Sequence, residues 1–484
     1  MRGGEKHTGL SPVIDFSTLQ PMASSNLSRS SVAVLLTLTP AALLALSDGA
    51  IDPAALSGGT FTVATESAWA YRLPPVVLSA AQLEVFTEGR KGFDQRWVVA
   101  PSILGLWGRG PTSNGEACID CHENGGRGSP PADGTEPMRS MLVRLSIPGA
   151  GPHAAPNPDP AYGDQLQNEG ILGRVPPEGD PRLTWEVRTI AMADGEIVRL
   201  RAPVLDLRRL NFGPLGGDVM TSARVAPPLI GVGLLDAVPD AAIRAIAASQ
   251  QGKGLDGRPN VVRDLINRRD AIGRFGHKAN QPSAEQQILF AYHADLGVTS
   301  HLFPEENCTP VQLQCLAEPP GGHPELPEAF LDTVLFYVRA LSVPARRSVA
   351  DPQVKRGEAL FAAAGCAGCH VPALQTGDYA PLPALSHQII HPYTDLLLHD
   401  MGHELADGRP DFGAGPRDWR TAPLWGLGLS HTVNGNSTLL HDGRARNITE
   451  AILWHGGEAL ASRDAFRNMP KPERDALITF LRSL

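Results

Sequence analysis

The chain has 484 residues, which is long enough for two or three domains with hydrophobic cores. Its 42% hydrophobic and 19% charged residues are typical of a soluble globular protein, and its net charge of −9 argues against a nucleic-acid partner. The 50 glycines and 43 prolines predict long ordered loops.

The N-terminal residues have the features of an export signal. Arg29 is followed by an apolar run at 31–46, which Pro40 interrupts and which is too short for a comfortable membrane span. We therefore expect residues 1–47 to be an N-terminal extension and a cleaved signal peptide, with synthesis beginning at Met22. The signal predicts a periplasmic protein, and no later segment is apolar enough to span a membrane.

A first chemical motif follows a predicted helix at 78–96, for which Ser79 can serve as the N-cap. The motif is Cys118-Ile-Asp-Cys121-His122. Its two thiols lie about one helical turn apart, so both can add to the vinyl groups of one porphyrin, and the adjoining histidine can bind the iron. The motif therefore predicts a covalently attached c-type haem with His122 as an iron ligand.

The segments after this motif alternate between apolar and polar residues. Residues 185–192 and 196–201 flank Asp194-Gly195, which is a turn sequence. This pattern predicts a β-hairpin inserted into an otherwise helical domain.

An internal echo links the two halves of the chain. Residues 224–234 begin Arg-Val-Ala-Pro-Pro-Leu and resemble residues 420–429, which begin Arg-Thr-Ala-Pro-Leu. Amphipathic helices are predicted after them, at 240–248 and 448–455. The chain is therefore predicted to contain two related haem domains, with coincidence between two Pro/Gly loops as the alternative.

Cys308 and Cys315 belong to neither haem motif. They lie close together in sequence near Pro310, so they can close a short loop as a disulfide, as in exported proteins. A pair of free thiols is the alternative, and the absence of an adjoining histidine argues against a third haem.

A second Cys-x-x-Cys-His motif, Cys366-Ala-Gly-Cys369-His370, lies in the last third of the chain. A zinc site would need four ligands gathered at one place, and a thioredoxin-like pair would not be followed by histidine. Two such motifs therefore predict two covalently bound c-type haems, with His122 and His370 as iron ligands.

Predicted helices close each haem domain. A helix at 326–341 ends the first domain and a helix at 471–484 ends the second. We expect an N-terminal haem domain at 48–345 and a C-terminal haem domain at 346–484. The expected fold is mainly α, with two cytochrome c-like haem domains, the first enlarged by the β-hairpin and long loops.

Several residues are candidates for the ligand on the distal side of each iron. Met401 and His441 are candidates for the second haem, because a thioether or an imidazole can bind haem iron. The alternative for Met401 is packing within a predicted helix at 396–401, on which His399 and His403 are expected to be structural or to contact haem propionates. For the first haem five residues are open candidates: His153, Met192, Met220, His277 and His293.

Five segments together resemble the di-haem oxidoreductase family of peroxidase-like proteins. The most specific are residues 393–402, 419–428 and 440–445, to which residues 454–459 and 224–234 add. The resemblance covers about residues 70–484 and implies a periplasmic two-domain cytochrome c fold with peroxidase-like chemistry. Two positions depart from the pattern: Leu440 stands where related peroxidases carry a methionine ligand, and His277 stands where the family usually has tryptophan.

The expected function is a periplasmic di-haem c-type oxidoreductase that passes electrons between its haems to reduce peroxide or a related oxidant. The expected partner is a small electron-donor protein or a quinol-linked cytochrome, and calcium between the domains is left open. Arg224 and Arg420 are expected to anchor propionates or loops. The alternatives are a non-catalytic di-haem electron-transfer cytochrome and an oxidase that modifies a protein side chain.

Overall fold

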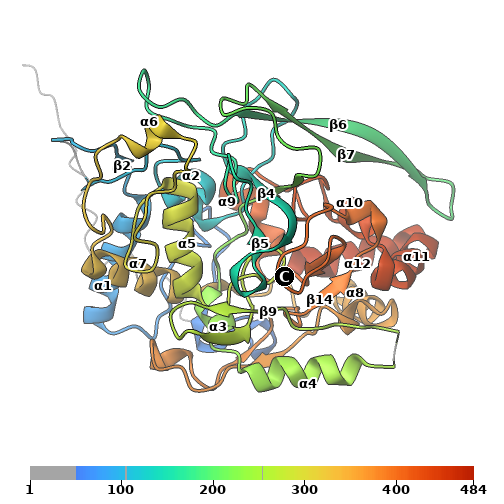
Figure 1. The fold of residues 1–484 in the computed structure, drawn as a ribbon. Helices are drawn as coiled ribbons and strands as arrows, with labels where there is room; N and C mark the ends of the chain where they lie inside the picture. The colour runs from blue at the N-terminus through green and yellow to red at the C-terminus, as the bar shows by residue number, and fades with distance from the viewer. Residues whose placement is uncertain (1–50, 104–105, 253) are drawn as a thin grey trace, which may run out of the picture. The chain divides into compact units, whose positions relative to one another are not determined.

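Two pairs of crossing helices frame the structure, a computed structural model that describes residues 51–103, 106–252 and 254–484. α1 (Ala80–Asp94) packs across α7 (Glu328–Arg339), and α8 (Pro352–Ala363) packs across α12 (Lys471–Ser483), one pair on each side of Figure 1. As predicted, the Ser79 hydroxyl caps α1 by accepting a hydrogen bond from the Gln82 backbone N–H. The Asp351 carboxylate caps α8 in a similar way.

Glycine allows both helix pairs to approach closely. A Cβ atom on Gly89 would lie 1.9 Å from the carbonyl oxygen of Thr333, and one on Gly357 would lie 2.0 Å from that of Ala476. Any larger residue would force the helices of each pair apart. The two crossings are therefore built in the same way.

The echo between residues 224–234 and 420–429 corresponds to a repeated packing arrangement. A Cβ atom on Gly233 would lie 2.1 Å from the carbonyl oxygen of Arg339, at the end of α7. One on Gly428 would lie 1.9 Å from the carbonyl oxygen of Arg482, near the end of α12. The two echo segments thus make the same kind of close contact, one with the end of α7 and the other with the end of α12.

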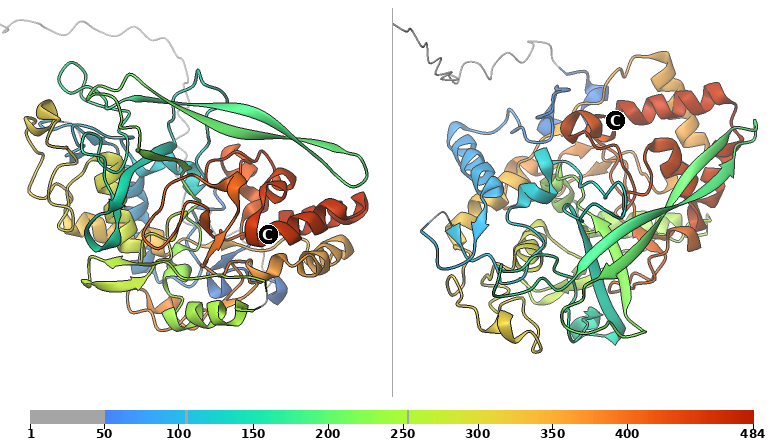
Figure 2. Two further views of the ribbon diagram at one scale, coloured as in Figure 1. Left: turned by 45° about the vertical axis from the view of Figure 1, so that its right-hand side comes forward. Right: turned by 90° about the horizontal axis from the view of Figure 1, so that it is seen from above.

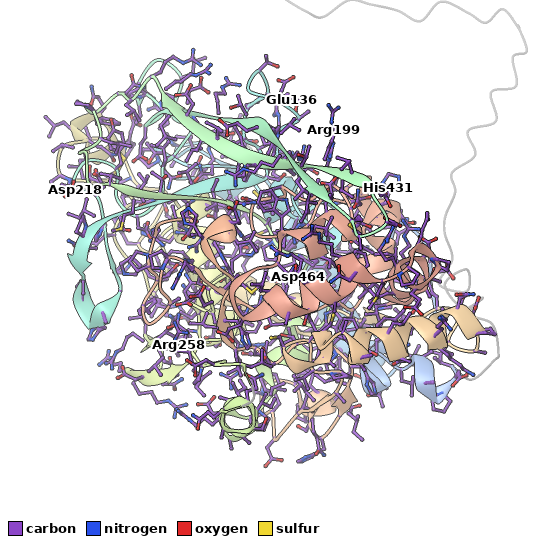
Figure 3. All side chains as sticks on the ribbon, turned by 90° about the vertical axis from the view of Figure 1, so that its right-hand side faces the viewer. Glu136, Arg199, Asp218, Arg258, His431 and Asp464 are labelled. Atoms are coloured by element: carbon purple, nitrogen blue, oxygen red, sulfur yellow. A yellow bond between two sulfur atoms is a disulfide. The ribbon has the colours of Figure 1, made fainter. Side chains whose placement is uncertain are left out.

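The predicted hairpin is confirmed and is longer than expected. β6 (Asp180–Ala191) pairs with β7 (Ile197–Arg208) in antiparallel register along its whole length. Its turn reaches the C-terminal helices, where Arg474 on α12 pairs with Asp194 at 2.8 Å and with Glu196 at 2.9 Å. Figure 1 and Figure 2 show the hairpin extending over this end of the molecule, and Figure 3 labels Arg199 on the hairpin and Asp464 on α11 (Leu460–Asn468).

The expectation of a mainly α fold is wrong. Only 32% of the structure is helical, and 19% is strand, divided among several small sheets. Proline and glycine interrupt helices, and alternating segments such as β4 (Met141–Ala150) and β8 (Met220–Val225) pair instead as strands. The fold is therefore mixed.

The predicted helix at 396–401 is also wrong. This segment contains β14 (Leu398–Asp400), which pairs with β15 (Asp418–Arg420). Leu396, Leu397 and Leu398 are all fully buried, so the apolar run reflects burial on every side and not one helical face. His399 and His403 consequently do not share a helix.

The remaining elements connect these parts. The other helices are α2 (Cys118–Cys121), α3 (Val232–Asp236), α4 (Asp240–Gln250), α5 (Ala284–Leu296), α6 (Leu313–Leu316), α9 (Ser430–Asn434) and α10 (Ile448–Trp454). The other paired strands of four or more residues are β9 (Val261–Asp264) and β10 (Arg269–Ile272). Two-residue strands include β1 (Thr62–Val63), β2 (Trp97–Val98), β3 (Leu106–Trp107), β5 (Pro156–Asn157), β11 (Val343–Pro344), β12 (Leu374–Gln375) and β13 (Ile389–Ile390). The helices predicted after the two echo segments are confirmed as α4 and α10.

The core joins the two halves of the chain. Its largest cluster of buried apolar side chains includes Phe93 and Tyr337 from the first half and Leu396 and Trp425 from the second. The described residues form one compact unit, and the predicted boundary at 345 stays a prediction. The predicted signal peptide and start at Met22 lie outside the described residues, within which no helix is long and apolar enough to cross a membrane.

Candidate functional site

The histidines of the two Cys-x-x-Cys-His motifs are held in the same way. The Nδ1 atom of His122 donates a hydrogen bond to the carbonyl oxygen of Pro227 at 2.8 Å. The Nδ1 atom of His370 donates one to the carbonyl oxygen of Tyr393 at 2.9 Å. A carbonyl acceptor at Nδ1 fixes the tautomer in which Nε2 carries the lone pair that binds a metal.

The surroundings of the two histidines also match. The ring of Phe93, on α1, lies 6.3 Å from the ring of His122, and the ring of Phe361, on α8, lies 6.3 Å from that of His370. Burial lowers the pKa of both histidines to about 4. Both imidazoles are therefore neutral at neutral pH, which is the form that binds iron.

One cavity is shared by the two motifs. Its wall includes Cys121, His122, Cys366, Cys369 and His370, together with apolar residues of α5 and α10. A flat apolar macrocycle fits such a wall, and a carboxylate of the macrocycle would find partners in Arg127. The Nε and Nη2 atoms of Arg127 are buried without a hydrogen-bond partner, and its side chain lines the cavity. The residues present therefore fit haem.

The two halves repeat a loop and a helix around this cavity. Residues 275–281 form a loop closed by a bridge between Phe275 and Gln281, and residues 439–445 form one closed by a bridge between Leu439 and Ala445. The loops place His277 and His441 at equivalent positions, each after a residue with positive φ (Gly276 at 77° and Leu440 at 70°). Both histidines are distal-ligand candidates in the sequence analysis, which does not pair them as equivalent positions.

A capped helix follows each loop. Ser283 caps α5 by accepting from the backbone N–H of Gln286 at 3.2 Å, and Asn447 caps α10 by accepting from that of Glu450 at 2.9 Å. Residues at four matching positions line the cavity in each half: Ala284, Gln287, Ile288 and Ala291 on α5, and Ile448, Ala451 and Ile452 on α10 with His455 directly after it.

His455 was not identified as a site residue from the sequence. The signal that could have found it is its spacing, because it continues the i, i+3, i+4, i+7 stripe that begins at Ile448. Its Nδ1 atom donates to the carbonyl oxygen of Ala451 at 2.7 Å.

The two predicted distal candidates for the second haem both line the cavity. Met401 is half-buried beside a cluster that includes Trp419 and Trp454. His441 is buried and stacks on Trp419, with 3.6 Å between the ring centroids and 8° between the planes, and its Nε2 lies 3.3 Å from Asp442. Burial lowers the pKa of His441 well below its usual value, so the ring is neutral.

Of the open candidates for the first haem, the structure brings one to the cavity. His277 lines it, with Nε2 donating to the carbonyl oxygen of Val225 at 2.8 Å. The side chains that do not line this cavity are His153, Met192, Met220 and His293.

His399 forms a charged structural contact. Its Nε2 bonds Asp395 at 2.9 Å, and its Nδ1 bonds Glu458 at 2.7 Å. Burial alone would lower its pKa, but hydrogen bonds, first of all with Asp395, raise it to about 12. With both nitrogens protonated, His399 cannot bind a metal, although it forms with Cys369 and Asp395 a group of metal-ligand spacing.

The two echo arginines line the cavity and bond protein groups. Arg224 pairs with Asp411 at 3.0 Å, while Arg420 donates from Nε to the carbonyl oxygen of Gly276 at 3.0 Å. Outside this region, Cys308 and Cys315 are joined as a disulfide with their Cα atoms 5.8 Å apart.

Comparison with known protein families finds a family that matches the chain. The family described as "Di-haem oxidoreductase, putative peroxidase" matches residues 52–484. The search of curated proteins finds no match, and neither does the search of solved structures. Because the family match extends over nearly the whole chain, this protein belongs to the di-haem oxidoreductase family.

Proposed function

We propose that the protein is an exported c-type oxidoreductase that passes electrons between two covalently bound haems and reduces hydrogen peroxide or a related oxidant. The observation that carries this proposal is the repeated setting of the two motifs. Each motif presents two cysteines and a histidine whose Nδ1 is held by a carbonyl, and both open into one largely apolar cavity.

The cysteines would hold the haems and the histidines would bind their irons. In each attachment a sulfur–carbon bond forms at the vinyl group, and the thiol hydrogen passes to the other vinyl carbon, so no electrons are gained or lost. Cys118 and Cys121 would attach the first haem, and Cys366 and Cys369 the second. When bound, the haems supply one-electron redox chemistry and an iron site for peroxide.

The chain itself must manage protons. Reduction of hydrogen peroxide to two waters takes two electrons and two protons, and a positioned acid or base is needed to move them. Asp295 lines the cavity near the first motif, and its carboxylate accepts a hydrogen bond from Gln165 at 2.9 Å. Burial raises the pKa of Asp295, which suits a group that takes up a proton and returns it.

Export and an external electron donor belong to the same proposal. The disulfide between Cys308 and Cys315 is the kind of bond that persists in oxidising compartments, such as the periplasm. A small electron-donor protein or a quinol-linked cytochrome would supply the two electrons per peroxide.

The test starts with protein produced in cells that mature c-type cytochromes. A pyridine haemochrome assay should find two haems per chain, and the Cys118→Ala/Cys121→Ala and Cys366→Ala/Cys369→Ala variants should each retain one. Low-temperature EPR of the diferric protein, repeated after reduction by one electron, should show a high-spin haem that reacts with peroxide beside a low-spin haem. Two low-spin haems that stay unreactive after half-reduction would instead support a non-catalytic electron carrier.

A further inference from the structure

The repeat allows the two sides of the cavity to be compared position by position. α5 and α10 each follow a closed loop and each is capped at its N-terminus, and four matching positions, the last of them directly after α10, line the cavity. Three of the four pairs hold no iron-binding group. The fourth pair differs in chemistry, because Ala291 on α5 corresponds to His455 after α10.

The imidazole of His455 is prepared for metal binding. Its Nδ1 donates to the carbonyl oxygen of Ala451 at 2.7 Å, the same type of contact that holds His122 and His370. The contact leaves Nε2 with a lone pair, and no hydrogen bond to Nε2 is present among the described residues. Burial lowers the pKa of His455, so the ring is neutral.

His455 also lies on the side of the second haem motif. His370 and His455 both line the cavity, and Trp454, the last residue of α10, lies in the apolar cluster that contains Phe361 and against which Cys366 packs. The chain after His455 then runs along the motif: a Cβ atom on Gly365 would meet the Ser462 hydroxyl at 3.1 Å, and Glu458 bonds His399 beside Cys369.

The other histidines that line the cavity contact protein groups through their ring nitrogens or ring faces. His277 uses Nε2 to bond Val225, and His399 bonds a carboxylate with each nitrogen. His441 is stacked on Trp419 with its Nε2 near Asp442. Besides the two motif histidines, His455 is thus the cavity histidine with a held Nδ1 and a free Nε2 among the described residues.

We propose that His455 is the sixth ligand of the second haem iron and that Ala291, at the equivalent place, leaves the distal face of the first haem iron open. This inference rests on the proposed function, because it requires haem at both motifs. It replaces Met401 and His441 as ligand candidates and explains how one repeated scaffold can hold a six-coordinate iron and an open one.

The first test removes the ligand. In the diferric wild type, near-infrared magnetic circular dichroism should show one haem with two histidine ligands. The His455→Ala variant should lose that signal, and added imidazole should restore it. The matched control is His431→Ala, an exposed histidine labelled in Figure 3, which should leave the signal unchanged. An unchanged signal in His455→Ala, or a wild-type band typical of methionine ligation that disappears in Met401→Leu, would overturn the assignment.

The second test adds a ligand. The Ala291→His variant should convert the high-spin EPR signal of the first haem to low spin and slow the reaction with peroxide at least tenfold. Retention of the high-spin signal by a folded Ala291→His variant would contradict the equivalence of the two positions. If the Ala291→His variant does not fold, the first test decides whether His455 binds the iron, through loss of the near-infrared signal in His455→Ala and its return with imidazole. A haemochrome assay that finds no covalent haem would refute the proposed function. Two attached haems whose iron ligands do not change in His455→Ala would refute only the assignment of His455.

Discussion

Asp295 shows how a single buried carboxyl can be tested for a role in proton transfer. If its carboxylate accepts a proton during peroxide reduction, the Asp295→Asn variant should lose about 10²-fold or more in rate, the usual contribution of a general base. Since burial raises its pKa, the wild-type rate should fall as the pH is lowered through that pKa, because the protonated acid cannot accept a proton. This pH dependence should vanish in Asp295→Asn.

Stopped-flow mixing of the half-reduced protein with peroxide over a range of pH measures both effects. Asp332→Asn, an exposed position on α7, is the control and should behave as the wild type. A wild-type rate and pH profile in Asp295→Asn, with two haems attached, would assign Asp295 a purely structural role.

Glu178 couples the stability of the protein to pH. Its carboxyl is buried and accepts hydrogen bonds from the Gln167 backbone N–H at 2.6 Å and from Gln312 at 2.5 Å. Burial raises its pKa to about 8, against the opposing effect of these hydrogen bonds. Between its unfolded pKa of about 4.3 and this value, the folded state keeps a proton that the unfolded state has released. The free energy of unfolding should therefore decrease as the pH rises through this window, by at most about 1.4 kcal/mol per pH unit from this group.

Denaturant midpoints measured across this window should show the slope in the wild type and a smaller slope in Glu178→Gln. Glu186→Gln, at an exposed hairpin position, should retain the wild-type slope. An identical slope in Glu178→Gln would show that Glu178 is ionised in the folded protein across the whole window.

At the scale of elements, the close helix crossings predict a large effect from one methyl group. The Cβ atom of a Gly357→Ala variant would meet the Ala476 carbonyl oxygen at 2.0 Å, so α8 and α12 would have to move apart. Overpacking of this kind costs about 1–3 kcal/mol. Lys355→Ala, on the exposed side of α8, should change stability by less than about 0.5 kcal/mol. Equal stabilities of the two variants in urea unfolding would contradict the crossing geometry.

Local patterns explain which elements could be predicted from the sequence. The helix cap at Ser79, the turn at Gly195 and the two Cys-x-x-Cys-His motifs depend on neighbouring residues, and the structure has the corresponding helix, hairpin and matched histidine settings. The segment at 396–401 is predicted as a helix but contains strand β14, because a fully buried strand and a buried helix have similar apolar runs. The correspondence of Ala291 and His455 follows from the two bridged loops and the two capped helices that precede these residues, which only the folded chain shows.

At the scale of the whole molecule, Lys278 forms hydrogen bonds that connect the two halves of the chain. It is fully buried in the first half's loop, and its ammonium donates to Asp407 at 2.8 Å and to the carbonyl oxygens of Arg409 at 2.8 Å and Gly415 at 2.9 Å, all in the second half. It also lies 4.5 Å from the ring of Trp419. Burial lowers its pKa to about 8, so it is still mainly charged at neutral pH.

The Lys278→Met variant should destabilise the protein by about 3–5 kcal/mol, because it leaves the buried Asp407 carboxylate without its closest partner. Lys471→Met is the matched control, since Lys471 also pairs with an aspartate, Asp475 at 2.7 Å, but at an exposed site where an ion pair contributes at most about 1 kcal/mol. Urea unfolding followed by tryptophan fluorescence measures both variants. If the halves depend on this contact, Lys278→Met should also separate a single transition into two. A loss no larger than that of Lys471→Met would mean that the apolar core shared by Tyr337 and Trp425 holds the halves together without it.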